Sequence, residues 1–137
     1  MSIIFLDLDH FKRITEDYGH LTGDEILRQA ATRILGEKRD EDMFARYGGE
    51  EFACLLRRTP LPAATVIAER MRRAVAGTPF QIHGTNDSHI VTLSAGVAQT
   101  EKHMRSYDEL IDLADRRPYE AKSGGRNRIV PAVFGKH

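Results

Sequence analysis

The segment SIIFLDL, residues 2–8, is nearly all apolar and rich in side chains that favour β-structure. A run of this kind predicts a central strand that is buried on both faces of a sheet. The following stretch HFKRITEDYG, residues 10–19, predicts a short helix that ends at Gly19. Two carboxylates, Asp7 and Asp9, therefore stand at the junction of a buried strand and a helix, where an uncompensated negative charge is costly.

The rest of the chain alternates between amphipathic helices and short strands. The order β-α-α-β-β-α-β-β-α-β predicts one α/β domain over residues 1–137, with a central mixed sheet flanked by helices. The predicted helices cover residues 22–36, 64–77 (opened by Pro60 and Pro62) and 106–125, and the predicted strands cover residues 43–47, 50–58, 79–84, 89–100 and 126–132. The side chains expected to face the sheet are Ile26, Leu27, Ala30, Ala31, Ile34 and Leu35 in the first of these helices and Val66, Ile67, Met71, Ala74 and Val75 in the second.

Composition excludes several classes of protein. The chain carries 20 basic and 20 acidic side chains, a balance that argues against a protein that coats nucleic acid. Cys54 is the only cysteine, so an internal disulfide is impossible and we expect a reducing, cytoplasmic compartment. No apolar run is long enough to cross a bilayer, and the N-terminal residues lack the features of a signal peptide, so we expect no membrane contact by this domain.

Acidic residues also follow the two glycines of a predicted hairpin, in the sequence RYGGEEF. Glu50 and Glu51 begin the second strand of that hairpin, where adjacent carboxylates repel each other unless a positive group meets them. An ordinary acidic turn is one interpretation, just as Asp7 and Asp9 are explained equally well as residues that cap the next helix. If the two strand ends face each other, however, their carboxylates form a site for a hard divalent cation on a triphosphate.

Two basic or amide-rich segments extend this hypothesis. The backbone N–H groups of His10, Phe11 and Lys12 fall at a helix N-terminus, where such groups bind phosphate. Lys122 and Arg126 come where a helix ends at glycines, so they either reach phosphate oxygens or only balance the helix dipole.

A further polar cluster precedes the helix predicted over residues 22–36. His20, Gly23 and Asp24 fit an ordinary turn followed by an acidic first helical turn. The carboxylate of Asp24 is also a good acceptor for the two adjacent donors on the Watson–Crick edge of guanine, whereas adenine offers only one donor there.

Three motifs in this order and spacing resemble the GGDEF domain of diguanylate cyclases: FLDLDHFKRITEDYGHLTGDE, ARYGGEEF and YEAKSGGRNR. The resemblance extends from Ile3 to about Val130. It implies a palm-like α+β fold with a mostly antiparallel sheet, related to adenylyl cyclases and polymerases. The implied activity is condensation of two GTP into cyclic di-GMP with release of pyrophosphate, in a homodimer in which each protomer holds one GTP.

The resemblance also assigns roles to particular residues. Glu50 matches the family's proposed base for the ribose 3′-hydroxyl, and it shares the metal and phosphate centre with Glu51. The ligands of Mg²⁺ or Mn²⁺ match Asp7, the Leu8 carbonyl, Glu50 and Glu51, and the triphosphate contacts match the amides of His10 to Lys12 together with Lys122 and Arg126. The remaining nucleotide-contacting positions correspond to Thr15, His20, Gly49 and Asp24, the last at the guanine edge.

A product-inhibition site is implied by the same register. Arg39 and Asp42 occupy the positions of the family's RxxD motif, and Arg70 matches a secondary contact from a neighbouring domain. An arginine reads guanine O6 and N7 with two hydrogen bonds while an aspartate accepts from its donor edge. Without the resemblance, the segment KRDED, residues 38–42, is interpreted as a solvated charged turn.

The chain departs from the family at three places. Thr15-Glu16 replaces the usual Asn-Asp, which predicts weaker GTP binding or looser base selectivity, and Pro118 replaces an apolar helix former. The family's lead-in helix is missing, so we expect a catalytic domain trimmed from a larger sensor protein. The alternative function is a catalytically weak or inactive GGDEF domain that serves as a cyclic di-GMP receptor.

Overall fold

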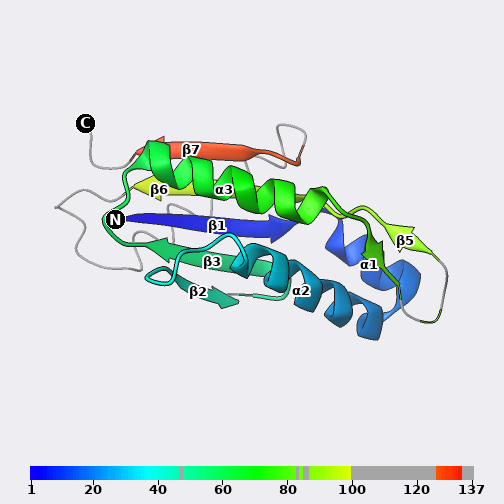
Figure 1. Ribbon diagram of the computed structural model, residues 1–137. Coiled ribbons are helices and arrows are strands. Elements are labelled where there is room, and N and C mark those ends of the chain that lie inside the picture. The colour runs from blue at the N-terminus through cyan, green and yellow to red at the C-terminus, as the bar shows by residue number, and fades with distance from the viewer. Residues whose placement is uncertain (47, 83, 85–86, 100–125, 134–137) are drawn as a thin grey trace.

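Five strands form one mixed sheet in the order β2-β3-β1-β6-β7, with β1 at its centre (Figure 1). The computed structural model describes residues 1–46, 48–82, 84, 87–99 and 126–133. Strand β1 pairs antiparallel with both β3 and β6, and β6 pairs parallel with β7. The strands of this sheet are β1 (Ser2–Leu8), β2 (Met43–Arg46), β3 (Glu51–Leu56), β6 (Leu93–Gln99) and β7 (Ile129–Val133). The predicted mixed sheet is confirmed.

The sequence of β1 explains its central position. Ile4, Phe5 and Leu6 are completely buried, as expected for a strand with neighbours on both sides and packing on both faces. Alternation along the strand sends Ile4 and Leu6 into the main core and Ile3 and Phe5 into a second, smaller cluster on the opposite face. By the same alternation, Asp7 lies on the face of Ile3 and Phe5, opposite the main core.

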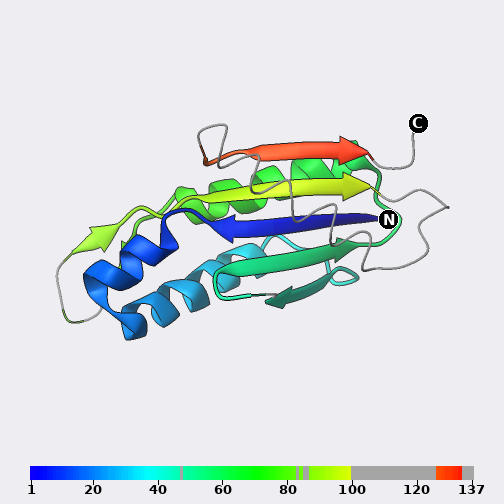
Figure 2. The ribbon, with the colours of Figure 1, turned by 180° about the vertical axis from the view of Figure 1, so that it is seen from behind.

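Two long helices cover the same face of the sheet, α2 (His20–Leu35) and α3 (Leu61–Ala76) (Figures 1 and 2). Most of their predicted apolar stripes pack on the main core, whereas Val66, Leu35 and the half-buried Ala74 do not. Val66 is 53% exposed and Leu35 is 43% exposed. Val66 lies beside the row Ile67–Met71–Val75 instead of in it, because residues four apart share a helix face and adjacent residues do not.

A short helix and a small hairpin lie beyond the C-terminal end of β1, namely α1 (Phe11–Tyr18) with β4 (Phe80–Gln81) and β5 (Ser88–His89) (Figure 1). Strands β4 and β5 pair with each other and not with the main sheet. The single strand predicted over residues 89–100 is therefore wrong in its first part. The chain leaves β5 at His89 and re-enters the sheet only at Leu93.

The start of α2 was also predicted too late. Gly19 lies directly before the helix with φ 90°, a backbone conformation that favours glycine, and the helix begins at His20. Gly23 and Asp24 therefore belong to the helix and do not form a turn before it. The helix predicted over residues 106–125, with Pro118 and Lys122, lies outside the described residues.

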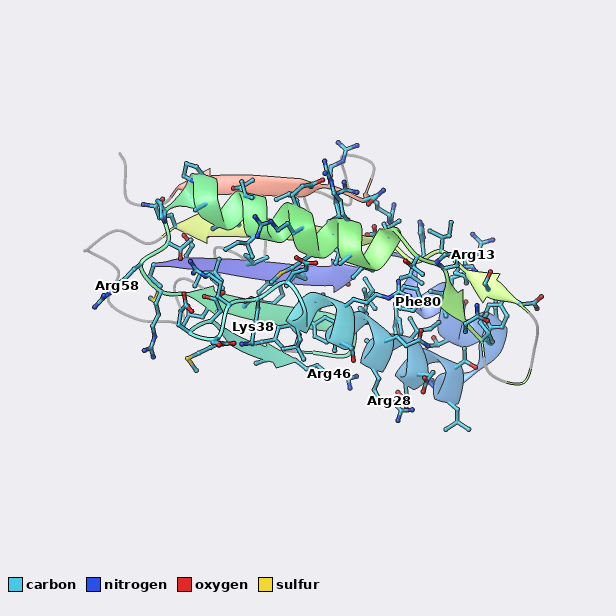
Figure 3. All side chains as sticks on the ribbon, viewed as in Figure 1. Arg13, Arg28, Lys38, Arg46, Arg58 and Phe80 are labelled. Atoms are coloured by element: carbon cyan, nitrogen blue, oxygen red, sulfur yellow. The ribbon has the colours of Figure 1, made fainter. Side chains whose placement is uncertain are left out.

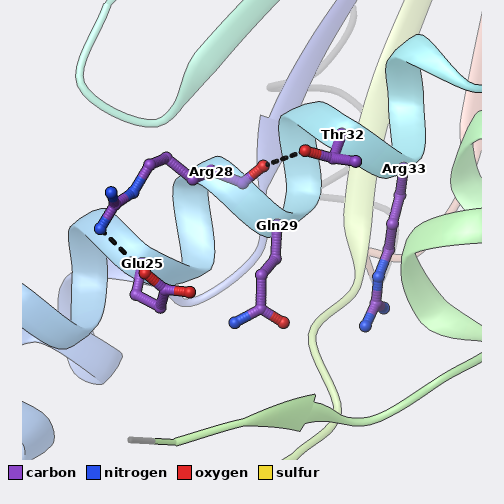
Figure 4. A pocket seen from close by; sticks show the side chains of 5 residues that line it. All are labelled: Glu25, Arg28, Gln29, Thr32 and Arg33. Carbon is purple, nitrogen blue, oxygen red and sulfur yellow. Dashed lines mark hydrogen bonds and ion pairs between the residues drawn. The ribbon is translucent and has the colours of Figure 1, made fainter.

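Arg33 ties α2 to the loop that follows α3. Its guanidinium donates hydrogen bonds to the carbonyls of Val75, Thr78 and Pro79 and lies 3.7 Å from the ring centre of Phe80. Burial lowers its pKa. Figure 4 shows Arg33 beside a cavity of about 340 Å³ whose other lining residues are Glu25, Arg28, Gln29 and Thr32. We assign this cavity no function, because the arginine at its edge already serves to hold the loop.

Within the described part of the chain, no helix has both the length and the apolar character needed to cross a bilayer.

Candidate functional site

The end of β1 and the start of β3 bring the predicted carboxylates together. In the antiparallel register, Asp7 is the direct partner of Glu51, and the N–H of Leu8 donates to the carbonyl of Glu50 at 3.3 Å. Directly paired residues of neighbouring antiparallel strands share a face, with Cβ atoms about 5 Å apart. The expectation that the two acidic strand ends face each other is confirmed, and it concerns residues far apart in the sequence.

An arginine shapes the turn that presents the two glutamates. Arg46, the last residue of β2, donates to the carbonyls of Gly48 (3.1 Å) and Gly49 (3.1 and 2.6 Å). Because peptide bonds are planar and trans, carbonyls drawn toward Arg46 turn the following N–H groups of Gly49 and Glu50 away from it. Sequence reasoning did not single out Arg46, although an arginine two residues before a double-glycine turn is a signal for such a clamp.

The N-terminus of α1 lies immediately beyond the same end of β1. His10 has the left-handed conformation φ 57°, ψ 25°, and the helix begins at Phe11 with no side-chain cap. The first N–H groups of a helix have no acceptor within the helix, so those near Phe11 and Lys12 are oriented for an anion. The predicted phosphate-binding turn is therefore next to the carboxylates, whereas the alternative that Asp9 caps this helix is wrong.

Thr15 uses its hydroxyl within its own helix. Its Oγ1 donates to the carbonyl of Lys12 at 2.8 Å, and its methyl group points at α2. A Cβ atom added to Gly23 would lie 2.6 Å from Thr15 Cγ2 and 3.2 Å from Phe11 Cζ. Gly23 therefore allows α1 and α2 to approach closely, which is a packing role and not the turn role expected for it.

We predict that Gly23→Ala destabilises the protein by about 1–3 kcal/mol through overpacking. This happens even though alanine is the better helix former by about 1 kcal/mol. Thr15→Ser removes the clashing methyl group and keeps the hydroxyl, so the double variant should recover most of the lost stability. Urea unfolding of the four proteins measures the effect, and a single Gly23→Ala variant at least as stable as the parent would contradict the inferred contact.

Asp24 lines a cavity of about 500 Å³ between α2 and the β2–β3 hairpin. Its neighbours in the lining are Leu27, Arg28, Ala31, Phe44, Arg46 and Phe52. The rings of Phe44 and Phe52 stack with centres 5.5 Å apart, so the cavity has an apolar floor and a charged rim. Arg28 and Arg46 both line this cavity, and Figure 3 labels the two side chains. His20 is exposed at the start of α2.

The candidate site spans two faces of the sheet. Phe52 and the Asp24 cavity belong to the face covered by helices, whereas Asp7 and Glu51 follow the alternation of the opposite face. A ligand that uses both groups must therefore cross the end of the sheet, over the turn at Glu50 and beside the start of α1. This explains why a turn without side chains, Gly48-Gly49, suits this position.

Asp9 is a buried anchor and not a member of the carboxylate cluster. It is 2% exposed, and it accepts hydrogen bonds from Thr92 Oγ1 (2.6 Å), Ser94 Oγ (2.6 Å) and the backbone N–H of Asn127 (3.0 Å). The last of these bonds brings Arg126, which is exposed, to the same end of the sheet as Asp7.

The predicted product-inhibition motif is an ion pair at the other end of the sheet. Arg39 donates from its backbone N–H and its guanidinium to both oxygens of Asp42, at 2.9–3.3 Å, and from Nη2 to Thr59 Oγ1 at 2.6 Å. The Asp42 side chain is 0% exposed and that of Arg39 is 39% exposed. The interpretation of residues 38–42 as a solvated turn is therefore wrong for Asp42.

This ion pair shifts both pKa values. Burial alone would raise the pKa of Asp42, but the hydrogen bonds and charge of Arg39 outweigh it and hold that pKa below its ordinary value. The same hydrogen bond raises the pKa of Arg39. Arg70, the third predicted inhibitory residue, is exposed on α3. Nearby, burial raises the pKa of Cys54 to about 12, so its thiol stays protonated and is no nucleophile.

A metal ion held by the described residues of this chain alone would keep coordination positions open for other ligands. Among the residues that the structure describes, no three or more His, Cys, Asp or Glu side chains form a ready cage. The donors at the end of β1 are nevertheless the hard oxygen ligands that Mg²⁺ prefers, and Mg²⁺ is commonly held by one or two carboxylates together with substrate phosphates. The residues present therefore fit a magnesium ion that binds together with a nucleotide.

A palm-like sheet with helices on one face and acidic strand ends beside a helix N-terminus is an arrangement suited to a nucleotide and its metal. Residues 1–128 match the family of diguanylate cyclase GGDEF domains, and the chain belongs to this family.

Two relatives with similar sequences are much longer proteins. The response regulator PleD of Caulobacter vibrioides is 40% identical over 130 residues, which cover 95% of this chain and 29% of PleD. The diguanylate cyclase DgcP of Pseudomonas aeruginosa is 42% identical over 132 residues, which cover 96% of this chain and 19% of DgcP. The chain thus spans less than a third of either relative.

Solved structures agree on the fold. The GGDEF domain of DgcB from Caulobacter crescentus, in complex with c-di-GMP, superimposes with a TM-score of 0.90 at 33% identity, over 95% of this chain and 76% of that one. The active GGEEF domain of a diguanylate cyclase from Vibrio cholerae gives a TM-score of 0.86 at 31% identity, over 99% and 83%. The predicted palm-like fold is confirmed.

Proposed function

We propose that this domain is a diguanylate cyclase that condenses two GTP molecules into cyclic di-GMP and pyrophosphate. The observation that carries the proposal is the pairing of Asp7 with Glu51, and of Leu8 with Glu50, next to the N-terminus of α1. The named relatives support it, as does a solved relative described as an active GGEEF domain, since this chain also reads GGEEF at residues 48–52.

The carboxylates act on the triphosphate of the substrate through a bound cation. Asp7, Glu50, Glu51 and the carbonyl of Leu8 would hold Mg²⁺ or Mn²⁺, which supplies charge neutralisation of the triphosphate and lowers the pKa of the attacking hydroxyl. Glu50 accepts the proton of the ribose 3′-hydroxyl, and Glu51 keeps the centre negative enough to retain the cation. Arg46 supports both by holding the carbonyls of the turn before them.

The rest of the nucleotide extends in two directions from this centre. The amides of His10, Phe11 and Lys12 and the guanidinium of Arg126 bind the triphosphate, together with Lys122. Gly49 lets the sugar cross the end of the sheet, and His20 and Thr15 border the base. Asp24 accepts from the guanine edge, and its cavity of about 500 Å³ has the apolar floor that a purine ring requires.

Catalysis requires two protomers. One domain offers one nucleotide site, and the reaction joins two nucleotides, so we propose a two-fold homodimer in which each copy presents its GTP to the other. The attacking 3′-oxygen of one nucleotide displaces pyrophosphate from the α-phosphorus of the other, and electrostatic placement supplies most of the acceleration.

The direct test is incubation of the chain with GTP and Mg²⁺, followed by chromatographic separation of the products. A version fused to a dimerising helix is needed as well, since an isolated domain can fail simply because it does not dimerise. Formation of cyclic di-GMP by the fusion supports the proposal. GTP left intact by the forced dimer, with cyclic di-GMP still bound, would instead favour a receptor.

The receptor is the second candidate function, and Thr15 is the observation that favours it. Its hydroxyl already donates to the carbonyl of Lys12, so it can only accept from guanine, whereas the asparagine usual in the family can both donate and accept. In either case we propose that product binds at Arg39, with Arg70 as a contact from a second domain. Since β1 separates this motif from Asp7 by about 17 Å, inhibition should be non-competitive with GTP.

We predict that Arg46→Met lowers turnover about 10- to 100-fold, because the turn that carries Glu50 loses its three hydrogen bonds. The Mg²⁺ concentration for half-maximal activity should rise in parallel. Arg57→Met, which removes an exposed arginine just after the other end of β3, is the matched control and should change neither. Faster amide exchange at Gly49 and Glu50 with unchanged turnover would show that the clamp shapes the turn without serving catalysis.

A further inference from the structure

A network of polar side chains connects α3 to the end of β1 through the residues that precede β7. Asp9, between the predicted metal ligand Asp7 and the start of α1, holds the backbone N–H of Asn127 at 3.0 Å. From the other side, Arg72 Nη1 donates to the side-chain oxygen of Asn127 at 2.7 Å. The residues joined by these two bonds are 118 and 55 positions apart in the sequence.

Arg72 is itself held in place on α3. Its Nε donates to Glu69 Oε2 at 2.9 Å, and its Nη2 contacts Glu69 Oε1. The side chain of Arg72 is 19% exposed, so the pair is partly shielded from water and its geometry is restrained. The hydrogen bonds from Arg72 lower the pKa of Glu69, which keeps this partner ionised.

The segment that this network holds is conformationally unusual. Arg126 and Asn127 have φ values of 65° and 47°, two consecutive residues in the left-handed region. That region is strained for a residue with a side chain, and less so for asparagine. Asn127 is the residue of the pair that tolerates the conformation, and it is also the one held from both sides. The guanidinium of Arg128 adds a contact to the Arg126 carbonyl at 3.2 Å.

We infer that Arg72 and Asp9 position Arg126 for the triphosphate by holding Asn127 between them. The inference rests on the proposed function, which gives Arg126 its contact with phosphate. Asp9 also precedes His10 directly, so one buried carboxylate sets both the start of α1 and the turn of Arg126. The two sets of phosphate donors, amides and guanidinium, are thereby kept in register although they come from opposite ends of the chain.

The test is a double-mutant cycle on binding, read with 3′-deoxy-GTP and Mg²⁺, since this nucleotide lacks the attacking hydroxyl and stays intact. Arg72→Met should weaken its affinity about tenfold, because Arg126 is no longer held. In an Arg126→Ala background, Arg72→Met should have no further effect. Arg73→Met is the matched control, since Arg73 also pairs with Glu69 on α3 but is far more exposed, and it should change the affinity in neither background.

Asn127→Gly provides a second route that keeps the backbone conformation and the N–H bond to Asp9 while it removes the acceptor for Arg72. It should reproduce the loss seen with Arg72→Met. Equal losses from Arg72→Met with and without Arg126, or no loss at all, would overturn the inference. If Arg126→Ala leaves the affinity unchanged, the phosphate contact of Arg126 in the proposed function is wrong as well. A loss with Arg126→Ala but none with Arg72→Met would contradict only the positioning role of Arg72.

Discussion

Glu50→Gln is expected to reduce cyclic di-GMP synthesis by at least about 1000-fold while the protein stays folded. The substitution keeps the size of the side chain but removes its charge and its basicity. The turn stays in place because the contacts that build it are made by Arg46 and by the backbone, with the Glu50 carbonyl still accepting from Leu8. The measurement is turnover of GTP by the dimerised domain, with thermal unfolding as the check on the fold.

Glu37→Gln is the matched control for this prediction. It makes the same change just after the end of α2, remote from the start of that helix where Asp24 lies. It should leave turnover within a factor of about two, because a surface charge at that distance is largely screened. Wild-type turnover by Glu50→Gln would show that the Glu50 carboxylate is neither the base for the 3′-hydroxyl nor a required metal ligand.

The parts of the site that sequence reasoning predicted are those determined by local pattern. The apolar run at residues 2–8 identified β1, and the double glycine identified the hairpin, so Asp7 and Glu51 could be expected at two strand ends. Their pairing in the structure agrees with the hypothesis that the two strand ends face each other. Such strand ends can be predicted from a single sequence because turn residues and hydrophobic periodicity indicate where a strand stops.

What escaped prediction depends on contacts between distant residues. Asp9 has the same residue type and setting as Asp7, yet one is buried under Thr92 and Ser94 while the other lies at the candidate site. Neither Arg72 nor Asn127 belongs to a pattern that indicates their contact across 55 positions. Gly23 was given the role of a turn residue because a glycine that permits close helix packing looks, in sequence, like one that makes a turn.

The location of Arg39 and Asp42 bears on how product inhibition would work. Their partner Thr59 accepts a hydrogen bond from Ser2 at its carbonyl, so the motif is anchored at the N-terminal end of β1, the end marked by Arg58 in Figure 3. The side chain of Asp42 has no exposed surface, so an incoming guanine meets Arg39 first. Product that engaged Asp42 as well would have to replace part of the bidentate pair, and we therefore expect Arg39 to dominate its affinity.

Asp42→Asn is expected to lower the free energy of unfolding by about 2–4 kcal/mol at neutral pH. Asparagine turns an amide group toward the guanidinium of Arg39 and removes the buried negative charge with which Arg39 pairs. Asp40→Asn, an exposed neighbour of the same type, is the control and should change stability by less than about 0.5 kcal/mol. Urea unfolding of both variants measures the difference.

The pH dependence of that difference separates an ion pair from simple packing. Because the folded pKa of Asp42 lies below its ordinary value of 3.8, its contribution is complete above that value and is lost as pH falls through the lower, folded pKa. The stability gap between the parent and Asp42→Asn should therefore shrink below about pH 4. A gap that stays constant down to pH 2 would mean that the carboxylate acts by shape alone. If Asp42→Asn also loses product inhibition, we attribute the loss to an Arg39 side chain that is no longer held in place, and not to a missing contact between Asp42 and guanine. Arg39→Met tests the contact of Arg39 with guanine directly.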